Sequence, residues 1–426
     1  MSEYLQQRYH VVVANPPCMT SRSMNKDLKA FAKAKFPDVK SDLFSMFIKR
    51  NCKLAKSGGD LGFMSPFVWM FISSYEKLRD FLIDKKTISS LIQLEYGGFS
   101  GAVVPICTFT LINEYLPGFE GNYIRLSDFK GSQNQSPKTL EAIENPDCGW
   151  FYRASDADFK KIPGAPIAYW VSPKIIEVFK QGITLNKLAD PVVGLQTGKN
   201  AKYLRLWYEV SIDSCGFGLS TQQEANLSGK KWFPYNKGGS FRRWYGNQEY
   251  LINWKNDGKE IRNYDGSVIR NSEFYFNESG SWSKVTSGQF CLRYFPKGFL
   301  FDVAGCSIFT KKRDFMLSLI GAMNSPIMDN TISAISPTLN YEVGQISAFP
   351  VYSDLKEGLG QETVEKMIYL SKNDWDSFET SWDFKVNQII DKSREIDDGL
   401  IEYIYHELEN KWKKTTKQMK ELEEEN

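Results

Sequence analysis

The chain has 426 residues, a formal net charge of +2 and 14% aromatic residues, enough for two or three domains with buried cores. The near balance of charges excludes a uniformly basic surface, so any surface for nucleic acid must be local. The seven cysteines form no Cys-x-x-Cys pair and share no metal-ligand spacing with the two histidines, which argues against zinc and for a reducing, cytoplasmic setting. The sequence shows no signal peptide and no apolar run long enough to span a membrane, so no span is expected.

The first predicted element is the apolar strand Val11–Ala14, which runs into Asn15-Pro16-Pro17-Cys18. The two prolines hold φ near about −65° and remove competing backbone donors. Open α/β folds place their chemistry at the carboxyl ends of such strands. Asn-Pro-Pro also occurs as an ordinary strand-ending turn, so the segments that follow decide between the two interpretations.

Helical and strand patterns alternate in the next hundred residues. Ser41-Asp42 is a candidate helix cap. The predicted elements are helices over Asp27–Lys35, Leu43–Lys56 and Tyr75–Asp84 and strands over Leu61–Met64, Ile88–Leu94 and Val103–Asn113. Such alternation predicts a doubly wound α/β fold over residues 1–115. The stretch from Asn122 to Pro163 is expected to be irregular.

Residues 165–350 are rich in aromatic residues, glycine and strand patterns, and residues 355–426 read as charged helices. Basic and aromatic side chains alternate in the first of these regions, a pattern that suits phosphate contacts and base reading. The candidates for DNA contact are Arg205, Lys231, Trp232, Arg242 and Arg243. An ordinary β-rich domain with exposed Lys and Arg explains the composition about equally well.

Several segments resemble one family. The tetrapeptide Asn15–Cys18 resembles motif IV of the amino-methyltransferases, (Asn/Asp/Ser)-Pro-Pro-(Tyr/Phe/Trp), with Cys18 in the aromatic position. Further segments resemble motifs V, VI and VIII of the gamma-ordered adenine methyltransferases, namely Ser41–Phe44, Gly58-Gly59, Leu61–Pro66, Gly97–Gly101 and Cys107–Phe109. With the aromatic and basic region after Gly194, and with Ile335–Ile346 and Ser381–Phe384, the chain is similar over nearly its whole length to the BREX (phage growth limitation) defence methyltransferases.

The resemblance implies three parts. Residues 1–163 would be the carboxyl-terminal half of the catalytic domain, a partial doubly wound, Rossmann-like sheet. Residues 164–352 would be a β-rich DNA target recognition domain, and residues 353–426 a helical segment. The implied activity is that of a site-specific DNA N6-adenine methyltransferase in a prokaryotic cytoplasm. Double-stranded DNA and other phage-defence proteins would be its partners, and S-adenosyl-L-methionine would be the methyl donor.

The resemblance also assigns roles. Asn15 and the carbonyl of Pro16 would accept the amino protons of a flipped adenine, Pro17 and Cys18 would complete the motif, and Phe99 would pack on the base. Two features depart from the family pattern. Cys18 cannot stack on a base, and no Gly-rich cofactor turn precedes Asn15. A central fragment that is inactive alone is therefore expected, with a catalytically inert DNA-recognition or assembly module as the alternative.

Overall fold

The computed structural model describes residues 7–99, 104–286, 289–335, 340–394 and 401–426. The chain forms two compact units, Met1–Lys180 and Gln181–Asn426, and each is described by itself. This division follows compactness, so the three functional parts expected from the sequence stay a prediction.

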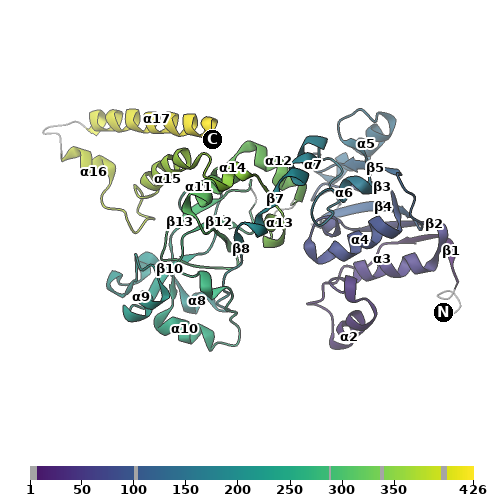
Figure 1. The fold of residues 1–426 in the computed structure, drawn as a ribbon, viewed down its shortest axis with the longest axis horizontal. Coiled ribbons are helices and arrows are strands. Elements are labelled where there is room, and N and C mark those ends of the chain that lie inside the picture. The colour runs from purple at the N-terminus through teal and green to yellow at the C-terminus, as the bar shows by residue number, and fades with distance from the viewer. Residues whose placement is uncertain (1–6, 100–103, 287–288, 336–339, 395–400) are drawn as a thin grey trace. The chain divides into compact units, whose positions relative to one another are not determined.

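Unit 1 contains a six-stranded mixed sheet with the order β1-β2-β4-β3-β5-β6 (Figure 1). The strands are β1 (Tyr9–Ala14), β2 (Ala55–Pro66), β3 (Thr87–Gln93), β4 (Ile106–Ile112), β5 (Glu120–Arg125) and β6 (Phe151–Ser155). Strands β1 and β2 pair in parallel, as do β3 and β5, while β4 pairs antiparallel with both β2 and β3. The carboxyl ends of β1, β2, β3 and β5 therefore lie at one edge of the sheet, together with the start of β4.

The first three α-helices of unit 1 follow the predicted alternation, and the later ones were not predicted. The α-helices are α2 (Lys26–Lys35), α3 (Leu43–Leu54), α4 (Glu76–Lys85), α5 (Ser132–Glu144), α6 (Asp156–Phe159) and α7 (Pro173–Gln181). The predicted cap is confirmed, because the Asp42 carboxylate accepts the backbone N–H of Phe44. The helix that follows ends at Leu54, and Lys56 belongs to β2 instead.

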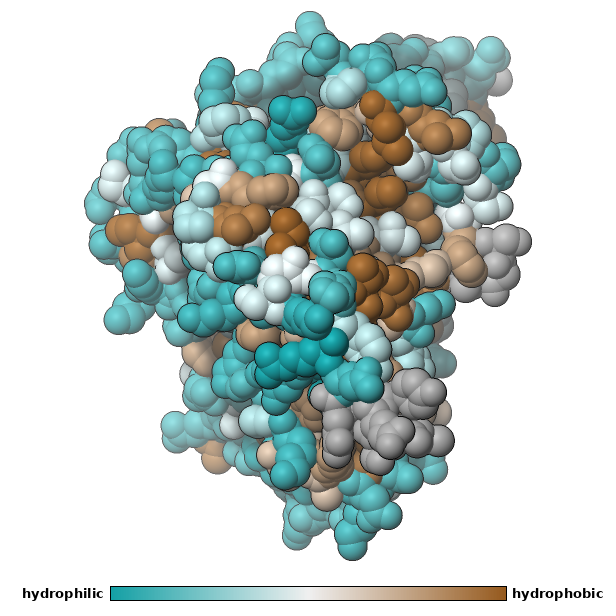
Figure 2. Space-filling view, turned by 90° about the vertical axis from the view of Figure 1, so that its right-hand side faces the viewer, coloured by the Kyte–Doolittle hydropathy of each residue, from teal (hydrophilic) through white to brown (hydrophobic). Residues whose placement is uncertain are grey.

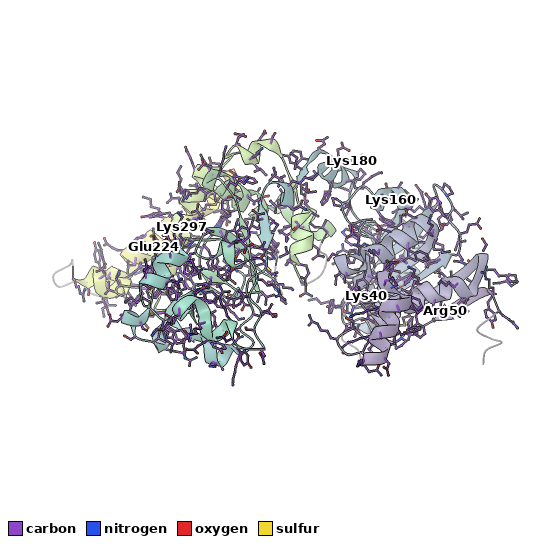
Figure 3. All side chains as sticks on the ribbon, turned by 60° about the horizontal axis from the view of Figure 1, so that its bottom comes forward. Lys40, Arg50, Lys160, Lys180, Glu224 and Lys297 are labelled. Atoms are coloured by element: carbon purple, nitrogen blue, oxygen red, sulfur yellow. The ribbon has the colours of Figure 1, made fainter. Side chains whose placement is uncertain are left out.

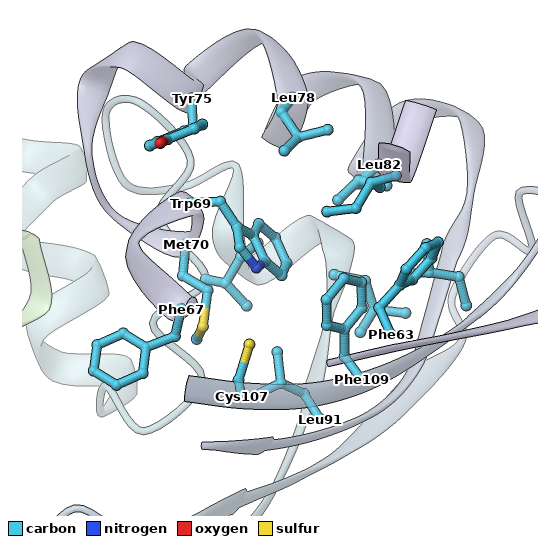
Figure 4. Packing of buried hydrophobic residues seen from close by; sticks show 14 of the residues in the cluster. Phe63, Phe67, Trp69, Met70, Tyr75, Leu78, Leu82, Leu91, Cys107 and Phe109 are labelled. Atoms are coloured by element: carbon cyan, nitrogen blue, oxygen red, sulfur yellow. The ribbon is translucent and has the colours of Figure 1, made fainter. Parts of the chain in front are cut away.

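The core of unit 1 lies between α4 and the sheet. Figure 4 shows Leu78 and Leu82 of α4 pointing toward Phe109 and Leu91 of the strands, with Trp69 between them. All five side chains are almost completely buried. Burial of this apolar area fixes the sheet and thereby the strand ends that carry the candidate site.

The expectation of irregular structure from Asn122 to Pro163 is wrong. This stretch contains most of β5, all of α5 and all of β6. The polar sequence of α5 hides it, because only Gln135 and Ala142 of its residues are buried. The Gln135 amide donates to the carbonyls of Phe129 and Gly131, so a side chain secures the amino-terminal end of this helix.

Unit 2 is built on two four-stranded sheets, β14-β10-β11-β9 and β13-β12-β15-β8, and a small pair, β16-β7. The strands are β7 (Ile183–Thr184), β8 (Asp190–Val192), β9 (Leu204–Leu206), β10 (Trp232–Asn236), β11 (Tyr250–Asn253), β12 (Ser279–Ser283), β13 (Arg293–Phe295), β14 (Leu300–Phe301), β15 (Gly305–Phe309) and β16 (Pro350–Val351). Short helices α8 (Asn200–Tyr203), α9 (Gln222–Leu227) and α10 (Lys255–Arg262) accompany the first sheet. The β-rich character expected for this region is confirmed.

Helices dominate the carboxyl-terminal part of unit 2, as expected. They are α11 (Arg313–Asn324), α12 (Pro326–Ile335), α13 (Val343–Ser347), α14 (Ser353–Lys356), α15 (Gln361–Trp375), α16 (Gln388–Ser393) and α17 (Ile401–Glu425). The charged helix α17 is anchored by the buried side chain of Leu422 in the same hydrophobic cluster as Leu317 and Met367. Overall, the expected α/β fold with a β-rich region and a helical carboxyl-terminal segment is confirmed.

Charged side chains such as Lys40, Arg50 and Lys160 of unit 1 extend from the ribbon in Figure 3. Within the described residues, no helix is both long enough and apolar enough to cross a membrane. In the same part of the chain, no group of three or more His, Cys, Asp or Glu side chains is arranged to hold a metal ion.

Candidate active site

Asn15 follows β1 directly and stands at the carboxyl edge of the sheet. Its side chain is exposed, and no hydrogen bond to its carboxamide occurs within the described residues. Pro16 is buried and packs against the protein, whereas Pro17 is exposed to solvent. Asn15 therefore presents a free carboxamide oxygen that can accept an N–H from a ligand.

Asp42 holds the loop that follows the two prolines. Its carboxylate accepts the backbone N–H of Met19 at 2.9 Å, and Leu43 donates its own N–H to the carbonyl of Met19 at 3.0 Å. Burial raises the pKa of Asp42, and partial burial with the nearby Asp42 carboxylate raises the pKa of Cys18. Cys18 is therefore a protonated thiol at neutral pH and offers no ring for stacking.

The second part of the site is the turn that joins β3 to β4. Phe99 is 45% exposed there, at the same edge of the sheet as Asn15. Residues 100–103 of this turn lie outside the described part of the chain. Sequence reasoning missed Tyr96, which is 39% exposed and contacts Phe67, the residue directly after β2, with ring centroids 6.3 Å apart. An aromatic residue just beyond a strand end was the available signal.

Three DNA-contact candidates of unit 2 lie together. The ring of Trp232 is 7% exposed, with the Lys231 ammonium 5.2 Å and the Arg205 guanidinium 5.6 Å from its centroid. Arg205 also donates to the carbonyl of Ala201 at 2.8 Å. The buried indole thus supports two cations at the surface and offers little area of its own for base stacking.

Arg242 and Arg243 occur in a loop that the carboxyl-terminal helices hold. The Arg242 guanidinium pairs with Asp374 of α15 at 2.5 Å, and Arg243 lies 3.8 Å from Glu423 of α17. Glu423 also accepts the indole N–H of Trp244 at 2.9 Å. One carboxylate therefore faces each of these two arginines, and the Nε atom of Arg243 is buried without a hydrogen-bond partner.

A buried cation supports the same loop. The Arg293 side chain is completely buried and donates to the carbonyl of Arg242 at 3.2 Å and to the Ser283 hydroxyl at 3.0 Å. Burial lowers the pKa of Arg293. Arg293 thus holds the loop from inside through the Arg242 carbonyl, and the carboxylates of Asp374 and Glu423 hold it from outside.

The described residues do not by themselves make a nucleotide-type cofactor site beside β1. No Gly-rich turn joins β1 or its neighbour β2 to a following helix in the part of the chain that the structure describes. Strand β1 is at the sheet edge, and its Val11 and Val13 side chains are 59% and 77% exposed. Figure 2 faces the side of the molecule on which β1 lies in Figure 1 and shows hydrophobic side chains gathered at the surface.

Comparisons of sequence place this geometry in context. The family model described as Eco57I restriction-modification methylase matches residues 2–99. The chain is 40% identical over 396 residues to the adenine-specific methyltransferase BrxX of Escherichia coli O9:H4 (strain HS), a match that covers 91% of this chain and 31% of BrxX. It is 37% identical to the adenine-specific methyltransferase PglX of Lacticaseibacillus casei (strain Zhang), with coverage of 91% and 33%.

Comparisons of structure agree on the fold. The Type IIL restriction-modification enzyme MmeI, solved in complex with DNA, superposes with a TM-score of 0.54 and 10% identity, covering 96% of this chain and 57% of MmeI. The Type ISP restriction-modification enzyme LlaGI, bound to a DNA substrate mimic, has a TM-score of 0.53 and 13% identity, with coverage of 87% and 36%. The chain is thus similar over 91% of its own length to the adenine-specific methyltransferases BrxX and PglX, and it spans about a third of their length.

Proposed function

We propose that this chain contributes the adenine-binding half and the DNA-recognition part of a site-specific DNA N6-adenine methyltransferase. The observation that carries the proposal is the free carboxamide of Asn15 at the carboxyl end of β1. The exposed ring of Phe99 at the same edge of the sheet supports it. The relatives named adenine-specific methyltransferases support the choice of base.

The residues suit an exocyclic amine. The carboxamide oxygen of Asn15 and the carbonyl of Pro16 would accept its two N–H protons, which leaves the nitrogen lone pair directed away from both acceptors. Phe99 would stack on the extruded base, and stacking of about 1–3 kcal/mol per base offsets part of the cost of flipping. Positioning of this kind is the contribution that these residues make to the rate.

The methyl donor that the family implies is S-adenosyl-L-methionine. The described residues beside β1 do not form its site alone, so we propose that a structure covering β1 completes it. The uncovered Val11 and Val13 side chains support this proposal. An exposed apolar edge strand is a surface that a further strand and helix would bury.

We further propose residues 164–352 as the DNA-recognition domain, residues 1–163 as the catalytic half, and residues 353–426 as a helical spacer. Arg205 and Lys231 would contact phosphates, with Trp232 as their support. Arg242 and Arg243 would contact DNA with the donors that Asp374 and Glu423 leave free. Double-stranded DNA in a prokaryotic cytoplasm, and other phage-defence proteins, would be the partners.

The alternative is a catalytically inert module that recognises DNA or assembles with other proteins. Two observations favour it for this chain alone, namely the thiol of Cys18 in the stacking position and the uncovered apolar face of β1. A module that recognises DNA shares DNA binding through unit 2 with the first proposal and differs from it only in methyl transfer, whereas an assembly module need not bind DNA.

The test is incorporation of labelled methyl groups into duplex DNA. Two proteins would be assayed with labelled S-adenosyl-L-methionine, the chain itself and a chimera in which it replaces the matching third of BrxX. The chimera is expected to methylate adenine and to lose this activity with Asn15→Ala, while the control Asn25→Ala, at the exposed cap of α2, retains it. A chimera that folds and binds DNA but transfers no methyl group would favour the inert module.

A further inference from the structure

Arg125 lies at the carboxyl edge of the sheet of unit 1 and has no carboxylate partner among the described residues. It is the last residue of β5 and is half-buried. Its guanidinium lies 4.7 Å from the ring centroid of Trp170. Its Nε atom is buried without a hydrogen-bond partner, and its side chain makes no ion pair within the described residues.

The guanidinium is held in place by its surroundings. The Trp170 ring packs edge-on against Phe71 at 5.6 Å and against Tyr169 at 5.0 Å. The backbone N–H of Arg125 donates to the carbonyl of Trp150 at 2.9 Å. An arginine fixed in this way loses little side-chain entropy when it binds a ligand, because its fork of donors is already oriented.

Glu95 follows two residues after Gln93, the register partner of Arg125, and forms no ion pair with Arg125 within the described residues. Its carboxylate accepts the backbone N–H groups of Gly97 at 2.9 Å and Gly131 at 3.3 Å. A half-buried guanidinium without a carboxylate partner keeps its capacity to bind an anionic ligand. The chemistry that fits a planar guanidinium is an anion with several oxygens, such as a phosphate.

The location relates Arg125 to the proposed base site. Strand β5 is four strands from β1 in the order β1-β2-β4-β3-β5, and Arg125 lies in register with Gln93 at the end of β3. Four strand spacings of about 4.8 Å place the ends of β1 and β5 about 19 Å apart. A duplex rises 3.4 Å per step, so this span is about six base pairs.

We propose that Arg125 binds a phosphate of the DNA backbone about half a helical turn from the base that Asn15 receives. This inference rests on the proposed function and deepens it. It makes the carboxyl edge of the catalytic sheet, and not only the recognition domain, a DNA-contacting surface. Such a phosphate contact fixes the register of the duplex over the site and carries no sequence information of its own.

The experiment measures binding of a random-sequence duplex by fluorescence anisotropy at several KCl concentrations. Arg125→Met keeps an apolar stem against Trp170 and removes the charge. Arg153→Met is the matched control, because Arg153 is an exposed arginine in the middle of the adjacent strand β6. Loss of one phosphate contact is expected to reduce the slope of log K against log[KCl] by about 0.9 for Arg125→Met. The control is expected to leave the slope unchanged, and Arg125→Lys, which keeps the charge, is expected to keep most of it.

The outcomes separate the two proposals. An unaltered chain that does not bind duplex DNA would overturn the proposed function. A chain that binds, with the same salt slope for Arg125→Met and Arg153→Met, would overturn the role of Arg125 alone. If Arg125→Met fails to fold, Arg125→Gln replaces it, with Arg153→Gln as its control and Arg125→Lys as the variant that keeps the charge. A smaller salt slope for Arg125→Gln than for Arg153→Gln supports the role of Arg125, and equal slopes overturn it.

Discussion

Replacement of Asp42 by alanine tests how the loop after Asn15 is positioned. The Asp42 carboxylate makes two different contacts, one with the N–H of Phe44 at the start of α3 and one with the N–H of Met19, which is 23 residues away in sequence. Alanine removes both contacts, whereas asparagine keeps an oxygen in the same place. The two variants therefore separate loss of the acceptor from loss of the charge.

The expected magnitude follows from the two contacts. Loss of a helix cap costs about 1 kcal/mol. Loss of a long-range hydrogen bond with a charged acceptor adds about 1–2 kcal/mol. Asp42→Ala is therefore expected to lower the free energy of unfolding of unit 1 by about 2–3 kcal/mol. Asp42→Asn is expected to remain within about 1 kcal/mol, because asparagine caps helices as well as aspartate.

The pH dependence has a definite sign. Burial raises the pKa of Asp42, so the folded state binds this proton more tightly than the unfolded state. The free energy of unfolding that Asp42 contributes therefore falls as the pH rises through its folded-state pKa. Asp42→Asn is expected to abolish this part of the pH dependence.

Urea unfolding and hydrogen exchange followed by mass spectrometry provide the measurements. Asn25→Ala serves as the control, since Asn25 caps α2 through Leu28 alone and is exposed. The amide of Met19 is expected to exchange faster in Asp42→Ala and not in Asn25→Ala. Equal destabilisation by the two alanine variants, with unchanged exchange at Met19, would refute the reasoning.

Three further outcomes are expected. Trp69→Ala removes a completely buried indole and should destabilise unit 1 by about 3–5 kcal/mol in urea unfolding, whereas a loss below about 1 kcal/mol would contradict its place in the core. The Asp302 carboxylate is 2% exposed and lies 2.6 Å from the Lys237 ammonium, so Lys237→Met should lower the free energy of unfolding of unit 2 by about 3 kcal/mol in thermal unfolding. Asp302→Asn on the Lys237→Met background should recover part of this loss. Glu423→Ala leaves the Trp244 indole N–H without its acceptor and should speed tryptic cleavage within residues 240–247, and an unchanged cleavage rate would show that Glu423 does not hold the loop.

The sequence predicted those parts of the fold whose periodicity matches their burial. Helix α3 has six buried residues, five of them on one face, and a carboxylate cap, and both signals are local. Helix α5 was missed because its polar run contains Pro137 and buries almost nothing. What supports it is the side chain of Gln135, which bonds to carbonyls of the preceding turn, and such a contact leaves no periodic signal.

The residues of the candidate site also divide into those with a local sequence signal and those without one. Asn15 was predictable because the strand and the prolines are contiguous in sequence. Arg125 was not, since what distinguishes it is Trp170, 45 residues later, and the lack of a carboxylate partner. Trp232 shows the converse case, because an aromatic residue beside a lysine in sequence can as easily lie beneath that lysine as beside a base.

Each hydrophobic cluster described here lies within a single unit, with Trp69 and Phe109 in unit 1 and Leu317, Met367 and Leu422 in unit 2. Substitutions in one core do not share packing partners with those in the other, so their effects on stability should add. Under the proposed function, the residues of unit 2 that read DNA can diverge without disturbing the packing of the strand that carries Asn15. The proposed recognition surface and the proposed base site would then change through separate sets of substitutions.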